Sequence, residues 1–438
     1  MSRNCKLGDI AELSTGPFGS QLHKSDYVNI GIPVIMPQNI NNLRNVDYSG
    51  IVQIKDSDYQ RLCRHALLED DIVFARRGEV DKHALISKSD LPMLCGTGCL
   101  RVRVTDGMVN PRYLSQYLNK PEVKARLRQH AVGSNMPNLN TGILAEIPIR
   151  LPDKSEQDTV VDLLDTIDNK IRTNQRICKE LEDTARLIYD YWFIQFDFPD
   201  ENGNPYRSSG GKMRFSKELK RNIPLDWKVV TINDLIHIQK GISYKSKDLL
   251  GGSNRMINLA SFSTNGSLKI DGLKSYSGAV DIRKIVTAFD LVMCITQQTD
   301  IDLTGATNVI GKTFIVPPIS DKTLVISTDV AKIIPNKPNV VFMLDQFFKR
   351  SDIHRYLVGF ANGTKIKHLD IAAACSLKIP IPPSESSIPE RFANLSKTFA
   401  SHIGKALQEN KELSHLRDQL LPMLMNGQVK IAESEFGA

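Results

Sequence analysis

The chain has 438 residues, of which 41% are hydrophobic and 24% charged, so it is long enough for two to three globular domains with sizeable cores. No apolar run approaches the ~18 residues that span a bilayer. Residues 1–6 carry no apolar signal region, so we expect a cytoplasmic protein. The seven cysteines form no paired Cys-x-x-Cys array, which argues against a disulfide framework or a zinc site and predicts reduced thiols.

The net charge of +7 is unevenly distributed along the chain. Residues 1–150 and 201–383 carry +4 and +10, whereas residues 151–200 and 384–438 carry −6 and −1. A basic region attracts phosphate and an acidic region repels it. If the protein binds nucleic acid, the two basic regions are therefore the parts that we expect to touch it.

Two stretches carry their apolar residues at alternating spacings of four and three, which is the pattern of a coiled-coil helix. In residues 156–193 the seam is Val160, Leu164, Ile167, Ile171, Asn174, Cys178, Leu181, Ala185, Ile188 and Trp192. In residues 389–424 the seam is Phe392, Leu395, Phe399, His402, Ala406, Glu409, Leu413, Leu416 and Leu420. One such helix could be an ordinary amphipathic core helix. Two of them, each closing one half of the chain, predict a paired coiled coil.

The sequence repeats itself with a period of about 220–230 residues. Residues 71–74 (Asp-Ile-Val-Phe) are echoed by residues 290–293 (Asp-Leu-Val-Met), and residues 149–152 (Ile-Arg-Leu-Pro) by residues 379–382 (Ile-Pro-Ile-Pro). Short alternating strands and a few helices in each copy predict an α+β fold. The expected organisation is a first domain at 1–152, a helical region at 153–196, a turn-rich linker at 197–214, a second domain at 215–383, a second helical region at 384–428 and a tail at 429–438.

Some local elements can be placed within the first copy. Pro111 suits the first turn of a helix, and a second helical piece follows Pro121. Pro148 and Pro152 exclude helix, so we expect extended chain over residues 139–152. The long helix then begins near residue 155, with Asp153 or Ser155 as its cap.

The sequence offers no convincing catalytic centre. Residues 95–98 (Cys-Gly-Thr-Gly) resemble a cofactor loop, but they precede a strand where such a loop should follow one. Residues 122–124 (Glu-Val-Lys) have the spacing of a nuclease metal site but lie in a helical stretch. Cys95 and Cys99 with His83 could ligate a metal, although a turn with two buried thiols is the favoured interpretation.

Binding features are more informative. Arg76, Arg77 and Lys82 lie on a turn after a strand, where arginine can reach guanine edges or phosphates. At the matching place the second copy has Gln297 and Gln298, and glutamine can pair with adenine. Each feature could equally be a solvated polar turn. The further candidates for binding DNA are Lys24, Asn135, Asn138, Lys365, Lys367 and His368.

Five stretches of the chain are informative by their sequence and by their order. They are residues 71–78 (Asp-Ile-Val-Phe-Ala-Arg-Arg-Gly), 133–157 (from Gly133 to Glu-Gln), 164–171 (Leu-Asp-Thr-Ile-Asp-Asn-Lys-Ile), 191–197 (Tyr-Trp-Phe-Ile-Gln-Phe-Asp) and 416–427 (Leu-Arg-Asp-Gln-Leu-Leu-Pro-Met-Leu-Met-Asn-Gly). With these motifs the chain resembles the specificity subunits of type I restriction-modification enzymes over nearly its whole length. The second copy departs from the pattern. There Ser386 and Ser387 replace the Glu-Gln pair, and residues 296–300 replace the Arg-Arg-Gly turn.

The resemblance implies two target recognition domains, each reading half of a bipartite double-stranded DNA site, and two helices that pair antiparallel as a spacer. It implies that methyltransferase subunits, two in number, dock on the helices and that restriction subunits join the complex. S-adenosylmethionine, ATP and Mg would then belong to those partners, and this chain would hold no cofactor, metal or catalytic residue. The residues that we expect to bind partners are Leu164, Ile171, Trp192, Phe193, Leu413 and Leu420.

Two other classes of function stay open. A stand-alone methyltransferase or nuclease would need its own active site. A coiled-coil scaffold with basic domains that bind protein would show only weak salt dependence of any DNA binding, because a steep dependence comes from phosphate contacts.

Overall fold

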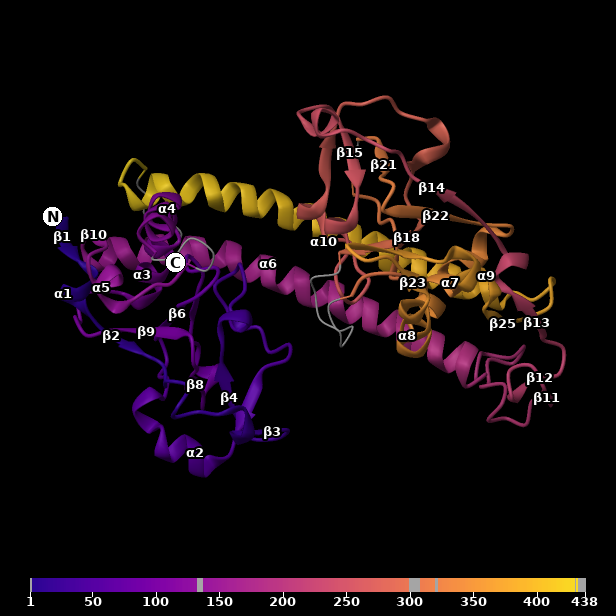
Figure 1. The fold of residues 1–438 in the computed structure, drawn as a ribbon, viewed down its shortest axis with the longest axis horizontal. Coiled ribbons are helices and arrows are strands. Elements are labelled where there is room, and N and C mark those ends of the chain that lie inside the picture. Colours follow the sequence, from indigo (N-terminus) through magenta and orange to yellow (C-terminus); the bar gives the residue numbers. More distant parts are fainter. Residues whose placement is uncertain (1, 132–136, 299–307, 320–321, 430, 432–438) are drawn as a thin grey trace, which may run out of the picture. The chain divides into compact units, whose positions relative to one another are not determined.

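The computed structural model describes residues 2–131, 137–298, 308–319, 322–429 and 431 (Figure 1). The chain forms two compact units, Met1–Ile171 with Leu413–Ala438 (unit 1) and Arg172–Glu412 (unit 2). Each unit contains one of the two predicted domains together with part of each long helix. Among the described residues, no helix is long and apolar enough to cross a membrane.

In its described part, unit 1 has two four-stranded sheets and one two-stranded pair. The first sheet has the order β2-β9-β6-β7, with strands at Ala11–Thr15, Cys99–Val104, Ile72–Ala75 and His83–Leu85. The second has the order β3-β5-β4-β8, with strands at Tyr27–Val28, Val52–Ile54, Ile32–Ile35 and Leu94–Cys95. The pair is β1 (Arg3–Lys6) and β10 (Pro148–Leu151), which run antiparallel.

The short helices of unit 1 are α1 (Leu7–Ile10), α2 (Asp56–Arg61), α3 (Pro111–Leu118), α4 (Pro121–His130) and α5 (Thr141–Ala145). Helix α3 begins as predicted. Pro111 occupies its first turn, and the Asn110 side chain accepts a hydrogen bond from the Arg112 backbone N–H. The buried face of α3 supplies Tyr113 and Leu114 to a core that also contains Leu164 of the first long helix. This packing seats the domain on the helix.

In its described part, unit 2 also has two four-stranded sheets. The order β14-β22-β18-β20 joins Ile236–Lys240, Val330–Pro335, Leu291–Cys294 and Thr313–Ile315. The order β16-β15-β21-β17 joins Lys274–Tyr276, Asn254–Ile257, Leu324–Ile326 and Ile285–Val286. Strand β13 (Lys228–Thr231) pairs with β25 (Lys378–Ile381), and β11 (Met213–Ser216) pairs with β12 (Arg221–Pro224). A three-stranded sheet, β19-β24-β23, joins Thr296–Gln298, Ile366–Leu369 and Ala361–Asn362.

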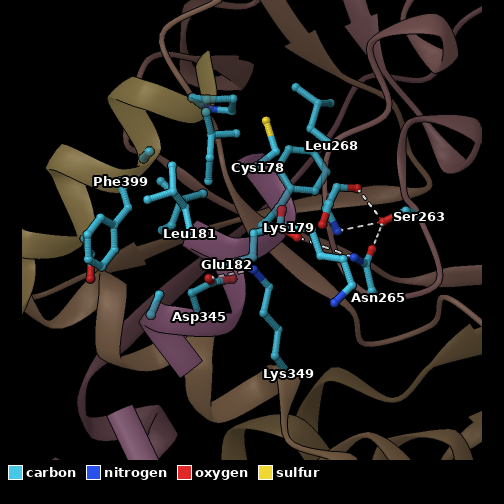
Figure 2. Close-up of a pocket in the computed structure, with 18 of the residues that line it drawn as sticks. Cys178, Lys179, Leu181, Glu182, Ser263, Asn265, Leu268, Asp345, Lys349 and Phe399 are labelled. Carbon is cyan, nitrogen blue, oxygen red and sulfur yellow. Dashed lines mark hydrogen bonds and ion pairs between the residues drawn. The ribbon is translucent and has the colours of Figure 1, made fainter. Parts of the chain in front are cut away.

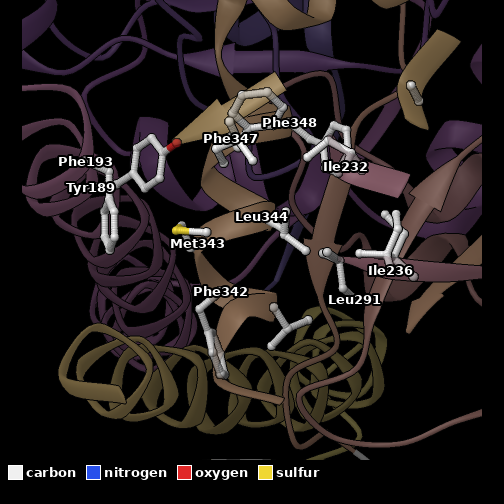
Figure 3. Close-up of a cluster of buried hydrophobic side chains, with 14 of the residues drawn as sticks. Tyr189, Phe193, Ile232, Ile236, Leu291, Phe342, Met343, Leu344, Phe347 and Phe348 are labelled. Atoms are coloured by element: carbon white, nitrogen blue, oxygen red, sulfur yellow. The ribbon is translucent and has the colours of Figure 1, made fainter. Parts of the chain in front are cut away.

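The short helices of unit 2 are α7 (Val341–Lys349), α8 (Ser351–Gly359) and α9 (Ile371–Ser376). Helix α7 is the counterpart of α3 and is buried along most of its length. Its Phe342, Met343 and Leu344 lie between strand residues such as Leu291 and the aromatic residue Tyr189 of the first long helix (Figure 3). Burial of large side chains at this place makes it the main core of unit 2.

The two units share most of their topology. The first four-stranded sheet has the same neighbours in each, and the second sheets share three strands, β5-β4-β8 in unit 1 and β16-β15-β21 in unit 2, in which one strand pair runs parallel. That contact joins β4 to β8 at Val34 and Leu94 in unit 1, and β15 to β21 at Met256 and Val325 in unit 2. A crossed, partly parallel arrangement that occurs twice in one chain with the same neighbours indicates duplication. The prediction of a duplicated α+β domain is therefore confirmed.

Each long helix follows its domain, as predicted. Helix α6 spans Lys154–Tyr189 and continues into a π-helical turn, Asp190–Ile194. Its cap is Asp153, whose side chain accepts a hydrogen bond from the Glu156 backbone N–H. Helix α10 spans Ile388–Met425. The π-helical turn widens the end of α6 and presents Trp192 and Phe193 to the core.

The helices contact each other in both units, and in each unit the contacts run antiparallel. In unit 2, the Asn174 side-chain NH₂ donates to Glu409 Oε2 at 2.7 Å and to Asn410 Oδ1 at 2.9 Å. Further along α6, the ring of Tyr189 packs against Phe392 at 6.2 Å between centroids. As the residue number rises on α6, it falls on α10.

Unit 1 shows the same direction. The guanidinium of Arg417 donates to Asp168 at 3.0 Å, whereas Val160 shares a core with Leu424. The antiparallel contacts expected of the two helices are present within each unit.

The seam predicted for α6 is right, because all ten of its positions are buried or half-buried. The seam predicted for α10 is off by one residue along much of the helix. Leu395 and Leu416 are 38% and 44% exposed and His402 is exposed, whereas the buried polar residue is Asn410 rather than Glu409. Exposed leucines on the opposite face mimic a seam with the same period, and spacing alone cannot separate the two faces.

Two further expectations need correction. Residues 139–152 are not all extended, since α5 forms a helical turn whose cap is the Asn140 side chain, bonded to the Ile143 backbone N–H. Five residues are too few to show a helical period. Residues 197–214 are turn-rich but not a free linker. Phe198 is 5% exposed and stacks on Trp227, and Asp197 is buried and bonded to Ser208.

Candidate nucleic-acid interface

In unit 1, two polar segments that are far apart in the sequence meet at the end of β6. Arg77 forms a β-bridge with Asn138. The Arg76 carbonyl accepts from the Leu139 backbone N–H at 2.8 Å, and the Gly78 N–H donates to the Pro137 carbonyl at 3.2 Å. We call this surface, made of Arg76, Arg77, Gly78, Pro137 and Asn138, the domain 1 lip. It unites three of the residues that the sequence indicated.

The domain 1 lip holds polar atoms without partners. Arg76 Nε, Asn138 Oδ1 and the hydroxyl of the neighbouring Thr97 are buried and have no hydrogen-bond partner among the residues that the structure describes. Thr97 lies next to the domain 1 lip, because the Arg76 backbone N–H donates to the carbonyl of the following residue, Gly98, at 2.7 Å. Buried polar groups are nearly always paired, so the partners of these three atoms lie outside the described residues, and water or a polar ligand can supply them.

Thr97 was missed as a candidate for this role. The sequence drew attention to residues 95–98 only as a possible cofactor loop. Its position could have been found from strand pairing, because Ala75 at the end of β6 lies opposite Cys99 at the start of β9. The residues just before β9, Thr97 and Gly98, therefore have to adjoin the residues after β6.

The other candidates of unit 1 are less closely placed. Lys82 forms an ion pair with Glu79 at 2.7 Å within the same turn. Lys24 is exposed and lies just before β3, in the other four-stranded sheet. Asn135 lies outside the described residues.

In unit 2 the equivalent segments also meet, here as a regular sheet. Strand β19 runs antiparallel to β24, so that Gln297 lies opposite Lys367 and Thr296 lies opposite His368. Lys365 precedes β24 in the turn that joins it to β23. We call β19, β23, β24 and this turn the domain 2 lip. Lys365 and His368 are exposed and Lys367 is half-buried.

The prediction that Gln297 reads a base does not fit the structure. Its side chain is 5% exposed, and its Oε1 accepts a hydrogen bond from the Val309 backbone N–H at 2.9 Å. An amide held in this way supports the fold of the lip. Gln298 is placed as the last residue of β19.

The residues considered for metal or cofactor chemistry are built into the core. Cys95 and Cys99 are 1% and 0% exposed, and burial raises the pKa of the Cys95 thiol to about 12. His83 is buried, with its Nε2 at 3.0 Å from the Ser115 carbonyl, and burial lowers its pKa to about 3. Among the described residues, no group of three His, Cys, Asp or Glu side chains could hold a metal ion. Residues 122–124 lie in α4, as expected.

Four of the six predicted partner-binding residues do not fit that role, because they are buried inside the chain's own cores. Leu164, Ile171, Trp192 and Phe193 are between 0% and 8% exposed. Leu164, Ile171 and Trp192 have the seam spacing because they hold the helices and domains together, and Phe193 lies beside Trp192 in the core of unit 2. Leu413 and Leu420 are half-buried. The apolar residues that the long helices do expose are Leu163, Ile177, Leu187, Tyr191, Leu395, Leu416 and Met423.

Comparison with known proteins agrees with this duplicated arrangement. The sequence model of the type I restriction modification DNA specificity domain matches the chain twice, at residues 2–183 and 224–409. The chain belongs to this family. Both matches end inside a long helix, so that the family unit is a domain with the helix that follows it.

Individual relatives are distant but match over most of their length. The chain is 21% identical over 437 residues to the specificity subunit of the type I restriction enzyme MjaIX of Methanocaldococcus jannaschii, with 98% of this chain and 93% of the relative covered. It is 22% identical over 433 residues to the HindI specificity subunit of Haemophilus influenzae, with 86% and 90% covered.

Among solved structures, the type I restriction-modification S subunit from M. genitalium covers 97% of this chain and 96% of its own, with a TM-score of 0.55 and 14% identity. At that identity the likeness supports the fold alone.

Proposed function

We propose that this chain is the DNA-specificity subunit of a type I restriction-modification complex and that it is not itself a catalyst. Each domain reads one half of a bipartite double-stranded DNA site through its lip. The observation that carries the proposal is the duplicated lip. In both domains the fold brings the same two segments together, but it places different polar side chains there, arginines in domain 1 and lysines with a histidine in domain 2.

The chemistry of the two lips suits DNA. Arg77, which is exposed, and Arg76, with its unpaired Nε, offer forked donors that match guanine edges or phosphate oxygens. Lys365 and Lys367 offer point charges that suit phosphate. The net charges of the two domain regions, +4 and +10, add a general attraction for the duplex. Two half-sites of different sequence follow from two lips of different composition.

The helices are the proposed docking surface for methyltransferase subunits, and restriction subunits complete the complex. Exposed leucines and Tyr191 on the helices are the residues that suit such a surface, in place of the buried ones expected from the sequence. S-adenosylmethionine, ATP and Mg act in those partners, and the complex works in the cytoplasm.

Methylation mapping tests this function. The chain is co-expressed with the methyltransferase subunit encoded beside it, in a host that lacks both, and the modified bases are sequenced. We expect a two-part motif with a fixed unread gap that disappears when this chain is omitted. Modification without this chain would support a scaffold role instead, and modification by this chain alone would reveal an active site of its own.

A further inference from the structure

One turn of unit 1 carries an unusual arginine. The turn lies between Ile40 and Val46, which form a β-bridge. Within it, the Asn41 backbone N–H donates to the Asn45 carbonyl at 3.1 Å. Arg44 has a positive φ of 61°. Few residues other than glycine adopt this conformation, so a side chain is present here at a conformational cost.

Unit 2 has the same turn with a glycine in place of the arginine. Its ends, Phe262 and Leu268, form the corresponding β-bridge, and the Ser263 N–H donates to the Ser267 carbonyl at 3.0 Å. The residue with positive φ is Gly266, at 83°. Matching bridges, hydrogen bonds and backbone conformation make Gly266 the counterpart of Arg44.

The Arg44 side chain lies against the long helices of unit 1. Its Nη2 donates to Asp168 Oδ2 of α6 at 2.5 Å, and its Nη1 donates to the Ser115 hydroxyl of α3 at 3.3 Å. Asp168 also accepts from Gln116 Nε2 of α3 at 3.1 Å and from Arg417 Nη1 of α10 at 3.0 Å. One carboxylate thus joins the turn, α3 and both long helices. We call Arg44, Gln116, Asp168 and Arg417 the domain 1 anchor.

The anchor is buried. Asp168 is 0% exposed and Arg44 is 8% exposed. Charged hydrogen bonds of this kind are directional, and any displacement that separates the partners leaves a charge without water or counterion. Apolar packing, in contrast, tolerates small shifts at low cost. The anchor therefore holds the domain to α6 in one orientation.

Unit 2 is built differently at the same place. Without a side chain at Gly266, the turn reaches α6 through Asn265, whose Nδ2 donates to Glu182 Oε2 at a longer 3.4 Å on the surface. Beside this contact lies a cavity of about 310 Å³ bounded by α6, α7, α10 and the turn (Figure 2). The buried acid, Asp345, forms an ion pair with Lys349 inside α7 at 2.9 Å, so this pair does not connect the domain to the long helices.

We infer that Arg44 and Asp168 are positioning residues that determine how many unread base pairs the protein accepts between its two half-sites. The inference rests on the proposed function. Helix α6 is continuous from Lys154 to Tyr189, so the orientation of domain 1 on α6 sets where its lip can meet the duplex. One added base pair moves a half-site by ~3.4 Å and rotates it by about a tenth of a turn, so a loosely held domain could follow it.

The test measures affinity for duplexes that carry both mapped half-sites with the native gap or with one base pair more or less. The full chain is used together with its methyltransferase subunit. We expect the wild type to prefer the native gap at least about tenfold. Arg44→Gly, which installs the residue found in domain 2, reduces this preference to less than about threefold. Arg44→Lys, which keeps the charge but not the forked donors, gives an intermediate preference.

A matched control separates positioning from stability. Lys349→Met also removes one positive charge and breaks a buried ion pair, but that pair lies within α7. It should lower the melting temperature without changing the gap preference. Because the readout is a ratio of affinities, a reduced fraction of folded protein does not affect it. If Arg44→Gly does not fold, Arg44→Lys provides the comparison.

The outcomes are distinguishable. A wild-type gap preference in the arginine variants, with or without reduced stability, would overturn the inference and leave the proposed function intact. A wild-type protein that does not recognise a bipartite site would instead refute the proposed function.

Discussion

The two domains share the strand order of their first four-stranded sheet, yet they differ at the turns that carry side chains toward a ligand or a helix. The lip of domain 1 presents Arg76 and Arg77, and that of domain 2 presents Lys367 on a regular sheet and Lys365 in the adjoining turn. The turn above the helices has Arg44 in one domain and Gly266 in the other. Backbone pairing constrains the sheets in both copies, whereas turn side chains have few such constraints and can diverge. The differences between the copies therefore mark the places where their roles differ.

The largest expected effect concerns the contacts of the two turns with α6. Asp168→Ala removes a buried carboxylate and leaves the buried guanidinium of Arg44 without its ion-pair partner, whereas Arg417 keeps its ion pair with Asp418. We expect the free energy of unfolding to fall by about 3–5 kcal/mol. Glu182→Ala removes the corresponding acceptor of unit 2, which receives a hydrogen bond from Asn265 at 3.4 Å on the surface. This variant should change the free energy of unfolding by less than about 0.5 kcal/mol. Denaturant titration measures both, and equal losses would contradict the contrast.

The next effect concerns the lips. Replacing Arg76 and Arg77 by alanine should weaken DNA binding by about 1–3 kcal/mol for each base that is no longer read, and should relax recognition of the first half-site. Replacing Lys365 and Lys367 by alanine should weaken binding more evenly across sequences, because phosphate contacts carry no base information. Affinity for duplexes with one half-site altered at a time distinguishes these results. Unchanged binding of the double arginine variant at physiological salt would refute the assignment.

How much of the fold and of the candidate site the sequence predicts depends on how far apart the contributing residues lie in the chain. Strand pattern and helix length depend on neighbouring residues, and the repeat is found by comparing the sequence with itself, so these features predicted the duplicated α+β fold. The meeting of Arg77 with Asn138 and of Gln297 with Lys367 was not predicted, because the two members of each pair lie far apart in the sequence. The anchor was not predicted, because Arg44, Asp168 and Arg417 are scattered through the chain and show no periodic signal. Burial was also beyond reach, which is why Gln297 and Phe193 were given exposed roles.

A smaller effect concerns pH, and it also separates the copies. His83 of β7 has a pKa of about 3 because of burial, against ~6.5 in the unfolded chain. Its counterpart in β20 is Thr313, which does not titrate. His83 bonds to the Ser115 carbonyl of α3, and the Thr313 hydroxyl donates to Asp345 of α7. Below pH 6.5 the unfolded chain binds the extra proton, so stability falls as pH falls, by up to ~1.4 kcal/mol per pH unit.

The measurement compares wild type with His83→Gln, whose amide can still donate to the Ser115 carbonyl. Free energies of unfolding are determined between pH 7.5 and 5, where acidic groups common to both proteins cancel in the difference. We expect the free energy of unfolding of the wild type to fall more steeply with acid than that of the variant. At pH 7.5, above the pKa of the unfolded histidine, the two slopes against pH should be equal. Parallel profiles would contradict the lowered pKa, because they would show that His83 binds its proton equally well in the folded and unfolded chains.

The smallest effect on stability tests the corrected face of α10. Leu416 is 44% exposed, so Leu416→Gln should change the free energy of unfolding by less than about 0.5 kcal/mol. Leu421, five residues later, is 2% exposed, and Leu421→Gln should cost about 1.5–3 kcal/mol because its apolar burial is removed. If the methyltransferase subunit docks on the exposed apolar residues, Leu416→Gln should nevertheless weaken its binding, measured by titration of the purified subunits. A large loss of stability from Leu416→Gln would restore the seam predicted from spacing, in which this leucine faces the core. Unchanged stability with weakened binding would identify the outer face of α10 as the partner surface, leaving its inner face to hold the domain.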